Sequence, residues 1–263
     1  MKTFDLPSLS TQRKALAEPA DVAEVPWKPL YRAGAVAGLL TVVLTLISLP
    51  IYLVWPIPNG LQPTASTVID LFTIFQNNWL RGLFNLDLVM LIATLLVVPL
   101  NLALFMSLRR VSPSWMAIAL ALSLMGSAAF LAINPSFTML SLSHTYAASS
   151  QAQRPLTVAA GQAILSAYQG TGFDMYYIWG AFSLLIMAVV MLRSTIFNKA
   201  TGYLGLITGI LMLVPPTVGT VGVVLAFLSL LPMFVWYLLL ARRLWQLGRP
   251  VSLEVAQASA HTN

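Results

Sequence analysis

The chain has 263 residues, of which 58% are hydrophobic and only 8% are charged. A soluble domain carries about 25% charged residues because its surface must be hydrated, so this composition excludes a fully water-exposed globule and indicates a protein covered by lipid. The net charge is +6, but the basic residues form short clusters between apolar runs, which favours anionic lipid over nucleic acid as a partner, and the absence of cysteine excludes disulfides, thiol catalysis and cysteine-ligated metals.

The two ends of the chain are polar. Residues 1–32 mix acidic and basic side chains with four prolines and contain no apolar run. This pattern predicts a disordered cytoplasmic tail with no cleavable signal peptide. Residues 244–263 are predicted to form a second cytoplasmic tail.

Between the tails, residues 33–243 are predicted to form an all-α bundle that crosses the membrane six times. A crossing needs about 20 apolar residues. Four runs meet this requirement plainly, and the uncharged stretch 203–241 is divided near Pro215, Pro216 and Gly219 into two crossings. The predicted spans are 33–55, 84–108, 115–133, 172–192, 202–216 and 218–241.

The basic residues predict the orientation of this bundle in the membrane. With six spans, twelve lysines and arginines fall on the side of the two tails and only Arg81 and Arg154 on the other. Cytoplasmic loops carry the excess of basic residues, so both termini are predicted to be cytoplasmic and the protein to lie in the cell membrane. A five-span count would move three of the arginines outside.

Glycines four residues apart predict where helices approach closely. Gly34 and Gly38 form such a pair in the first span, and Gly205 and Gly209 form one in the fifth. Small residues at this spacing allow backbones to pack together in lipid. The spacing does not identify the partner helices.

The two outer links are long enough to hold helices of their own. Apolar stripes at helical spacing occur in both, at Val68, Leu71, Phe72, Phe75 and Trp79, and at Leu156, Ala160, Ala163, Ile164 and Ala167. These amphipathic helices could cover a cavity or lie on the membrane surface as connectors.

Two carboxylates lie at the predicted outer ends of spans, Asp87 in the second and Asp174 in the fourth. An acidic residue there is stabilised by the helix dipole, which is one interpretation. The other is a ligand site at the mouth of an outward-facing pocket, because Arg81, Arg154 and His144 are predicted on the same side of the membrane.

Asp87, Thr94 and Asn101 recur every seven residues and therefore share one face of the second span. Polar groups within lipid face the protein interior. They either form hydrogen bonds between helices or line a cavity. Pro99 is expected to kink this helix and free a carbonyl group nearby.

Several membrane chemistries are excluded by the residues they need. Haem held between spans needs two membrane histidines and a retinal Schiff base needs a lysine in mid-span, but His144 and His261 fall outside the spans and every lysine is cytoplasmic. Asn-Leu-Asp87 and Gly-Phe-Asp174 lack the Gly-x-Gly-Asp signature of intramembrane aspartic proteases. We therefore expect no cofactor, no metal and no assigned catalytic residue.

One segment resembles an uncharacterised family of bacterial six-span membrane proteins that is classed as a domain of unknown function. The similar motifs are Leu86-Asp87, Leu108-Arg109-Arg110, Leu192-Arg193-Ser194, Phe197-Asn198-Lys199 and Gly202-Tyr203-Leu204-Gly205. The resemblance covers roughly residues 33–243. It implies a bacterial membrane location and six helices, and it carries no activity or site residues.

Three functional hypotheses remain from the sequence. The first is a protein that binds, senses or passes a small molecule through an outward-facing pocket, with Asp87, Asp174, Arg81, Arg154, His144 and Asn101 as candidate ligand-binding residues. The second is a structural or regulatory subunit of a membrane complex, as a homo-oligomer or with a partner membrane protein. The third is an enzyme at the outer interface.

Overall fold

The computed structural model describes residues 27–249, and within them the regular structure is entirely helical. Its elements are α2 (Lys28–Val54), η2 (Pro58–Leu61), α3 (Ala65–Asn77), α4 (Trp79–Asn85), α5 (Leu88–Leu108), α6 (Pro113–Ile133), α7 (Ser136–Ala148), α8 (Arg154–Tyr168), α9 (Thr171–Arg193), α10 (Lys199–Leu211), η3 (Pro216–Val218) and α11 (Thr220–Leu247). The predicted tails lie mainly outside the described residues.

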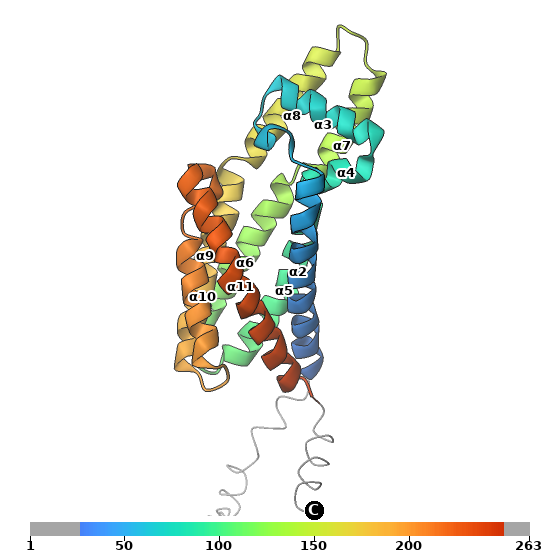
Figure 1. Ribbon diagram of the computed structural model, residues 1–263. Helices are drawn as coiled ribbons and strands as arrows, with labels where there is room; N and C mark the ends of the chain where they lie inside the picture. Colours follow the sequence, from blue (N-terminus) through green and yellow to red (C-terminus); the bar gives the residue numbers. More distant parts are fainter. Residues whose placement is uncertain (1–26, 250–263) are drawn as a thin grey trace, which may run out of the picture.

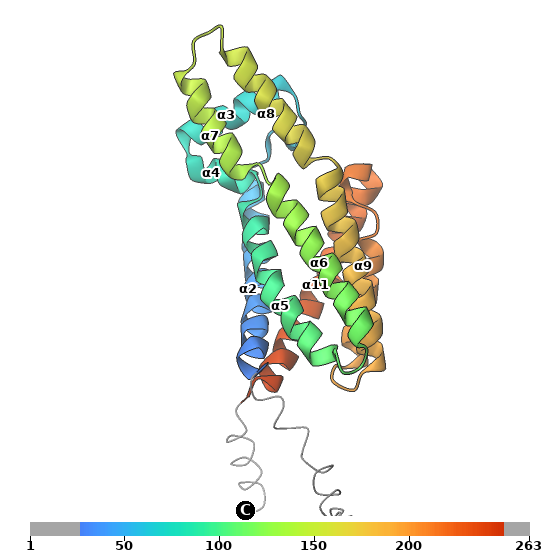
Figure 2. The same ribbon diagram turned by 180° about the vertical axis from the view of Figure 1, so that it is seen from behind.

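The helices form two layers that are stacked end to end (Figures 1 and 2). The long helices α2, α5, α6, α9 and α11 and the shorter α10 stand side by side as a bundle. Helices α3, α4, α7 and α8 gather at one end of this bundle, and we call them the cap. The start of α2 and the end of α11 lie at the opposite end.

Within residues 27–249, five helices are long and apolar enough to cross a membrane. The all-α membrane bundle predicted from the sequence is therefore confirmed in its class. The predicted span 202–216 corresponds to α10 and the turn after it. α10 has 13 residues, which at about 1.5 Å per residue is roughly 20 Å, shorter than the hydrocarbon core.

The first glycine pair packs α2 against its neighbours. A β-carbon built on Gly34 would lie 2.6 Å from Cβ of Ala103 and 3.3 Å from the carbonyl oxygen of Pro99, both on α5. One built on Gly38 would lie 3.7 Å from Ala241 on α11. The glycines thus let α2 lie close to both helices, as small residues do in lipid.

The second pair does the same for α10. A β-carbon on Gly205 would lie 2.9 Å from Nε1 of Trp236 on α11 and 3.0 Å from Cβ of Ala188 on α9, and Gly209 faces Leu185 and Ala181 on α9. The predicted packing role is confirmed, and the partner helices are α9 and α11.

A second apolar core, distinct from that of the bundle, fills the cap and extends to the cap end of the bundle, where Phe130 of α6 belongs to it. On α3 the predicted stripe is correct for Val68, Leu71, Phe72 and Phe75, which are all buried. Trp79 is 58% exposed because the chain turns at Asn78 and starts a new helix. The cap helices therefore pack mainly on one another.

The predicted stripe on α8 is wrong except at Ile164, which is partly buried against the apolar core of the cap. Leu156 is 72% exposed, and the buried face carries Thr157, Val158, Gly161, Leu165 and Tyr168 instead. Gly161 explains the choice of face, because a β-carbon there would lie 2.5 Å from Cγ1 of Val68. Close approach to α3 selects the glycine side of α8, although alanines make the other side equally apolar.

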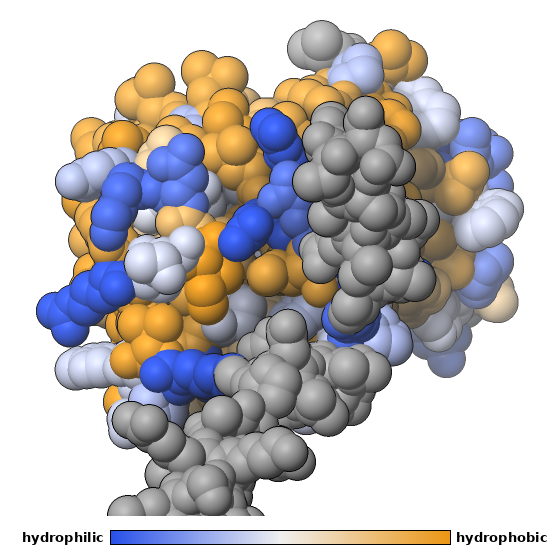
Figure 3. Space-filling view, turned by 90° about the horizontal axis from the view of Figure 1, so that it is seen from below, coloured by the Kyte–Doolittle hydropathy of each residue, from blue (hydrophilic) through white to orange (hydrophobic). Residues whose placement is uncertain are grey.

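Hydrophilic side chains lie at the end of the bundle opposite the cap (Figure 3), and several of the residues at this end are basic. Some of them tie segments together there: Arg32 donates to the carbonyl of Gly248 at 2.8 Å, Arg243 donates to that of Ile196 at 2.6 Å, and Arg109 stacks on Trp27. The cap holds Arg81 and Arg154. The described basic residues are thus separated between the two ends as the sequence predicted.

The Gly34 contact leads to a stability prediction. Replacing Gly34 by alanine forces two rigid β-carbons together, and we expect a loss of about 1–3 kcal/mol of unfolding free energy. Gly180→Ala is the matched control, because nothing lies within 4 Å of its added carbon. Thermal unfolding in detergent should show a lower midpoint for Gly34→Ala alone. Equal midpoints would contradict close α2–α5 packing.

Candidate functional site

The cap and the bundle are joined by polar contacts around residues 85–87, which we call the collar. The side chain of Asn85 donates to the carbonyls of Trp55 and Pro56, at 3.1 and 3.3 Å. The carbonyl of Leu86 accepts from Ser136 at 2.6 Å and from Asn134 at 3.3 Å. The end of α2, the α4–α5 junction and the α6–α7 junction therefore meet in one layer.

Asp87 is the charged member of the collar. Its backbone is left-handed, with φ of 62°, and it begins α5. Aspartate is one of the few residues that adopt this conformation readily, because its short side chain bonds locally. The turn directs the carboxylate away from its own helix end and toward α2 and α8.

Two tyrosine hydroxyls donate to this carboxylate. Tyr52 on α2 reaches Oδ1 at 2.7 Å, and Tyr168, the last residue of α8, reaches Oδ2. Both partners are neutral. Charge-assisted hydrogen bonds of this kind stabilise an ionised carboxylate in a poorly hydrated place, and they leave further lone pairs of both oxygens free.

Asp87 also lines a cavity of ≈ 400 Å³ between α2, α5, α9 and α11, the large chamber. In the two ribbon views α2 and α11 lie together at the basic end and separate toward the cap (Figures 1 and 2). The cavity lies where they separate. Most of its wall is apolar, with methionine, valine and aromatic side chains.

One wall of the large chamber is a polar stripe on α2. Thr41, Thr45, Ser48 and Tyr52 recur at helical spacing and all line it. The hydroxyls of the first three donate to backbone carbonyls one turn back, at 2.8–2.9 Å. Their hydrogens are therefore satisfied within the helix, and their lone pairs remain available to a guest.

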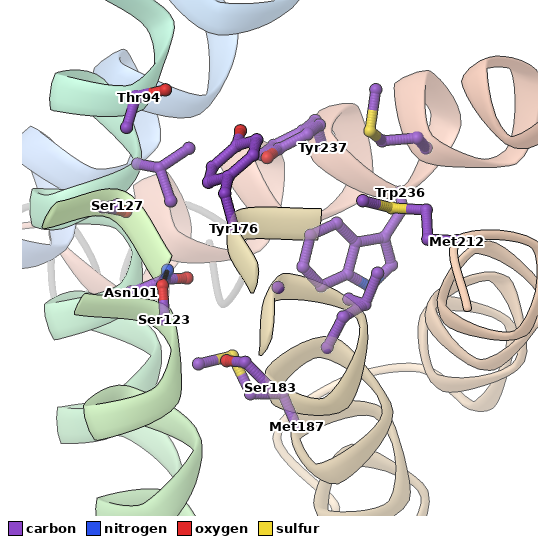
Figure 4. A pocket seen from close by; sticks show the side chains of 14 residues that line it. Thr94, Asn101, Ser123, Ser127, Tyr176, Ser183, Met187, Met212, Trp236 and Tyr237 are labelled. Atoms are coloured by element: carbon purple, nitrogen blue, oxygen red, sulfur yellow. Dashed lines mark hydrogen bonds between the residues drawn. The ribbon is translucent and has the colours of Figure 1, made fainter. Parts of the chain in front are cut away.

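A second, smaller cavity of ≈ 120 Å³ continues into the bundle (Figure 4). Thr94, Val97, Tyr176 and Tyr237 are among the residues that line both cavities, so the two are neighbouring compartments. In this small chamber the side chain of Asn101 donates to Ser123, and the buried Nε1 of Trp236 has no hydrogen-bond partner among the described residues.

The structure thus connects two of the predicted site residues. Asp87 and Asn101 both lie at the cavities, with Thr94 between them. Fourteen residues of helix separate the two, about 21 Å along the axis. The predicted polar face of α5 points to the interior. It forms a hydrogen bond between helices, from Asn101 to Ser123 on α6, and it also lines the chambers.

The other four predicted residues lie apart from the chambers. Asp174 accepts from Thr217 and so ties the start of α9 to η3. Arg81 is half-buried on α4, and its Nε has no hydrogen-bond partner within residues 27–249. Arg154 is exposed and stacks on Tyr146 at 5.1 Å, and His144 is exposed on α7. The cluster that the sequence suggested does not converge on one point.

The tyrosines at the site and the polar stripe on α2 were not predicted from the sequence. Tyr52, Tyr168, Tyr176, Tyr177 and Tyr237 all lie at the cavities or at Asp87. The stripe on α2 could have been found, because its spacing is regular. Tyr168 could not, since 81 residues separate it from Asp87.

No group of three histidine, aspartate or glutamate side chains that could hold a metal ion occurs in the part of the chain that the structure describes. The polar groups at the chambers are hydroxyls, one amide, one indole and one carboxylate. This set can bind a ligand by hydrogen bonds and by a single negative charge.

Comparison with known proteins gives a family but no activity. Residues 36–247 match the family described as a domain of unknown function, DUF4386, and the chain belongs to this family. The match covers both the cap and the bundle. Neither the curated proteins nor the solved structures contain a significant match.

The collar geometry leads to an order of stability among variants. Asparagine tolerates the left-handed backbone and still accepts hydrogen bonds, so Asp87→Asn should lose about 1–2 kcal/mol. Asp87→Val strains that backbone and strands two tyrosine hydroxyls, so its loss should be about 3 kcal/mol or more. Thermal unfolding followed by tryptophan fluorescence measures both.

Asp174→Asn is the control for this series, because it removes the same charge at the start of another helix. Its loss should be smaller than that of Asp87→Asn, because its one side-chain bond, from Thr217, is exposed. If Asp87→Val were as stable as Asp87→Asn, the left-handed turn and the two tyrosine bonds at Asp87 would contribute nothing to the junction.

Proposed function

We propose that this integral membrane protein binds a small amphipathic molecule in the two chambers, in order to sense it or pass it through the membrane. The large chamber carries the proposal, since it combines an apolar wall with a single carboxylate at one end. Ligand sites are typically concave and largely apolar, with a few polar groups that fix orientation.

The chambers also suit this role by their place in the bundle. They lie between helices, where bundles commonly bind ligands, and Asp87 is at the cap end of the cavity. Ionisable residues at membrane depth are costly and are retained mainly for function. The collar stabilises Asp87 there without a basic partner, which leaves its charge available to a ligand.

The proposal includes an orientation. We place the protein in the cell membrane with six crossings, both termini in the cytoplasm and the cap outside, so that the large chamber faces outward. The separation of basic residues supports this arrangement. α10 then makes a thin crossing, extended by Met212–Pro215 and η3, and it leaves Val218, which is 65% exposed, at the outer side.

Single cysteines test the orientation cleanly, because the chain has no cysteine of its own. An impermeant maleimide added to intact cells should label Val218→Cys and Ser150→Cys, which lies between α7 and α8. It should not label Val111→Cys, between α5 and α6. Protection of Val218→Cys together with labelling of Ser150→Cys would contradict the sixth crossing.

A cavity-filling variant tests binding. We expect amphipathic compounds from a library of cations, anions and neutral molecules to raise the melting midpoint of the purified protein, because a ligand that binds only the folded state stabilises it. At a concentration of 100 times Kd the gain is about 2.7 kcal/mol. Ala93→Phe places a ring in the large chamber and should abolish the shift.

Ala128→Phe is the matched control, because Ala128 is exposed on the surface of α6 and lines neither chamber. It should keep the ligand-induced shift. A shift of equal size in Ala93→Phe would place binding elsewhere, and the absence of any shift in the wild type would contradict the proposed function.

A further inference from the structure

We infer that the ligand of the large chamber is a cationic amphiphile, an amine or quaternary ammonium on an apolar body, with Asp87 as its counter-ion. This inference rests on the proposed function and adds the chemical class of the ligand. It follows from three properties of the cavity wall: the sign of its charge, its aromatic surface and the distribution of its polar groups.

The charge of the wall has one sign. Among the described residues that line the large chamber, Asp87 is the one carboxylate, and there is no lysine, arginine or histidine. Its hydrogen-bond donors, Tyr52 and Tyr168, are neutral and do not cancel the charge. Burial of a carboxylate disfavours its charge, and a cation bound beside it restores that charge, so this wall favours a cationic ligand over an anionic one.

Aromatic rings adjoin this carboxylate. Phe173, which lines the chamber, lies 5.9 Å from the ring of Tyr168 and 6.2 Å from that of Tyr177, on which it stacks. Tyr176 and Tyr237 continue the aromatic wall toward the small chamber. Ring faces attract cations, and quaternary ammonium groups in particular are recognised by aromatic walls.

The polar groups favour a ligand with one charged end. Hydroxyl oxygens of Thr41, Thr45 and Ser48 offer acceptor lone pairs along α2, because their hydrogens are already bonded to backbone carbonyls. A protonated amine supplies donors and no acceptors, so it fits these hydroxyl oxygens, whereas a quaternary ammonium would be held by the carboxylate and the ring faces. The apolar remainder of the chamber, with Met90, Val97 and Met233, accommodates a hydrocarbon body.

Thiol chemistry measures this selectivity with two small charged reagents in place of the natural ligand. Met90 lines the chamber one turn from Asp87 on α5, about 5–6 Å away between β-carbons. The Met90→Cys variant can be treated with two methanethiosulfonates of opposite charge, the trimethylammonium-ethyl and the sulfonato-ethyl reagent. Each rate is normalised to that of a free thiol in solution.

We expect the cationic reagent to react faster at position 90, and Asp87→Asn to lower the ratio of the two rates by about tenfold. Asp174→Asn, which removes a charge away from the chamber, should leave the ratio unchanged. Benzyltrimethylammonium should slow the labelling, whereas benzenesulfonate should not. Asparagine keeps the backbone geometry, so loss of selectivity reports charge rather than misfolding.

Two other outcomes are distinguishable. Both reagents could label position 90 rapidly, at a ratio of rates that Asp87→Asn does not change. This outcome would contradict the inference that the ligand is cationic, but not the proposal that the cavity binds a ligand. The control thiol is Leu95→Cys, at a position that is 51% exposed on the lipid side of α5. Labelling at position 90 as slow as at position 95, with both reagents, would overturn the proposed function itself.

Discussion

The fold depends on how a carboxylate is kept at the boundary between the cap and the bundle. Asp87 stands at a left-handed turn between α4 and α5, and its two oxygens are held by hydroxyls from α2 and α8. Each partner comes from a different helix. One side chain therefore fixes the relative positions of the cap and two bundle helices, which apolar contacts alone would fix less specifically.

The chambers follow from this arrangement. Glycine contacts and the hydrogen bond from the Arg32 side chain to the carbonyl of Gly248 hold α2, α5 and α11 together at the basic end. At the cap end the collar ties α2 to α5 and α8, and its described contacts do not include α11. The helices are consequently close at one end and apart at the other, and the large chamber lies between them.

The sequence predicts the bundle better than the site. Apolar length identifies the long membrane helices because lipid imposes it, and the glycine pairs mark the true contacts of α2 and α10. The buried face of α8 is not predictable in this way, because alanines make its exposed side as apolar as its buried side. The close approach of Gly161 to Val68 determines which face of α8 is buried, and the composition does not show this contact.

The candidate site likewise contains residues that the sequence predicts and residues that it does not. Asp87, Thr94 and Asn101 can be found from the sequence because one helix carries them, and the helical period alone places them on one face. Tyr168 and Tyr237 come from distant segments, so their position at the site needs the tertiary structure. Asp174 shares the local pattern of Asp87 but bonds only to the turn before α11. The local sequence therefore does not show which of these two aspartates lies at the candidate site.

The energy of the hydrogen bond between Asp87 and Tyr168 tests most directly whether this carboxylate joins the cap to the bundle. A double-mutant cycle with Asp87→Ala, Tyr168→Phe and the combined variant isolates their coupling from the backbone strain of either change. The account predicts a coupling of about 1.5–3 kcal/mol in unfolding free energy, as for hydrogen bonds to charged groups. Additivity within about 0.5 kcal/mol would contradict it, because the cap and bundle would then be joined independently of this carboxylate.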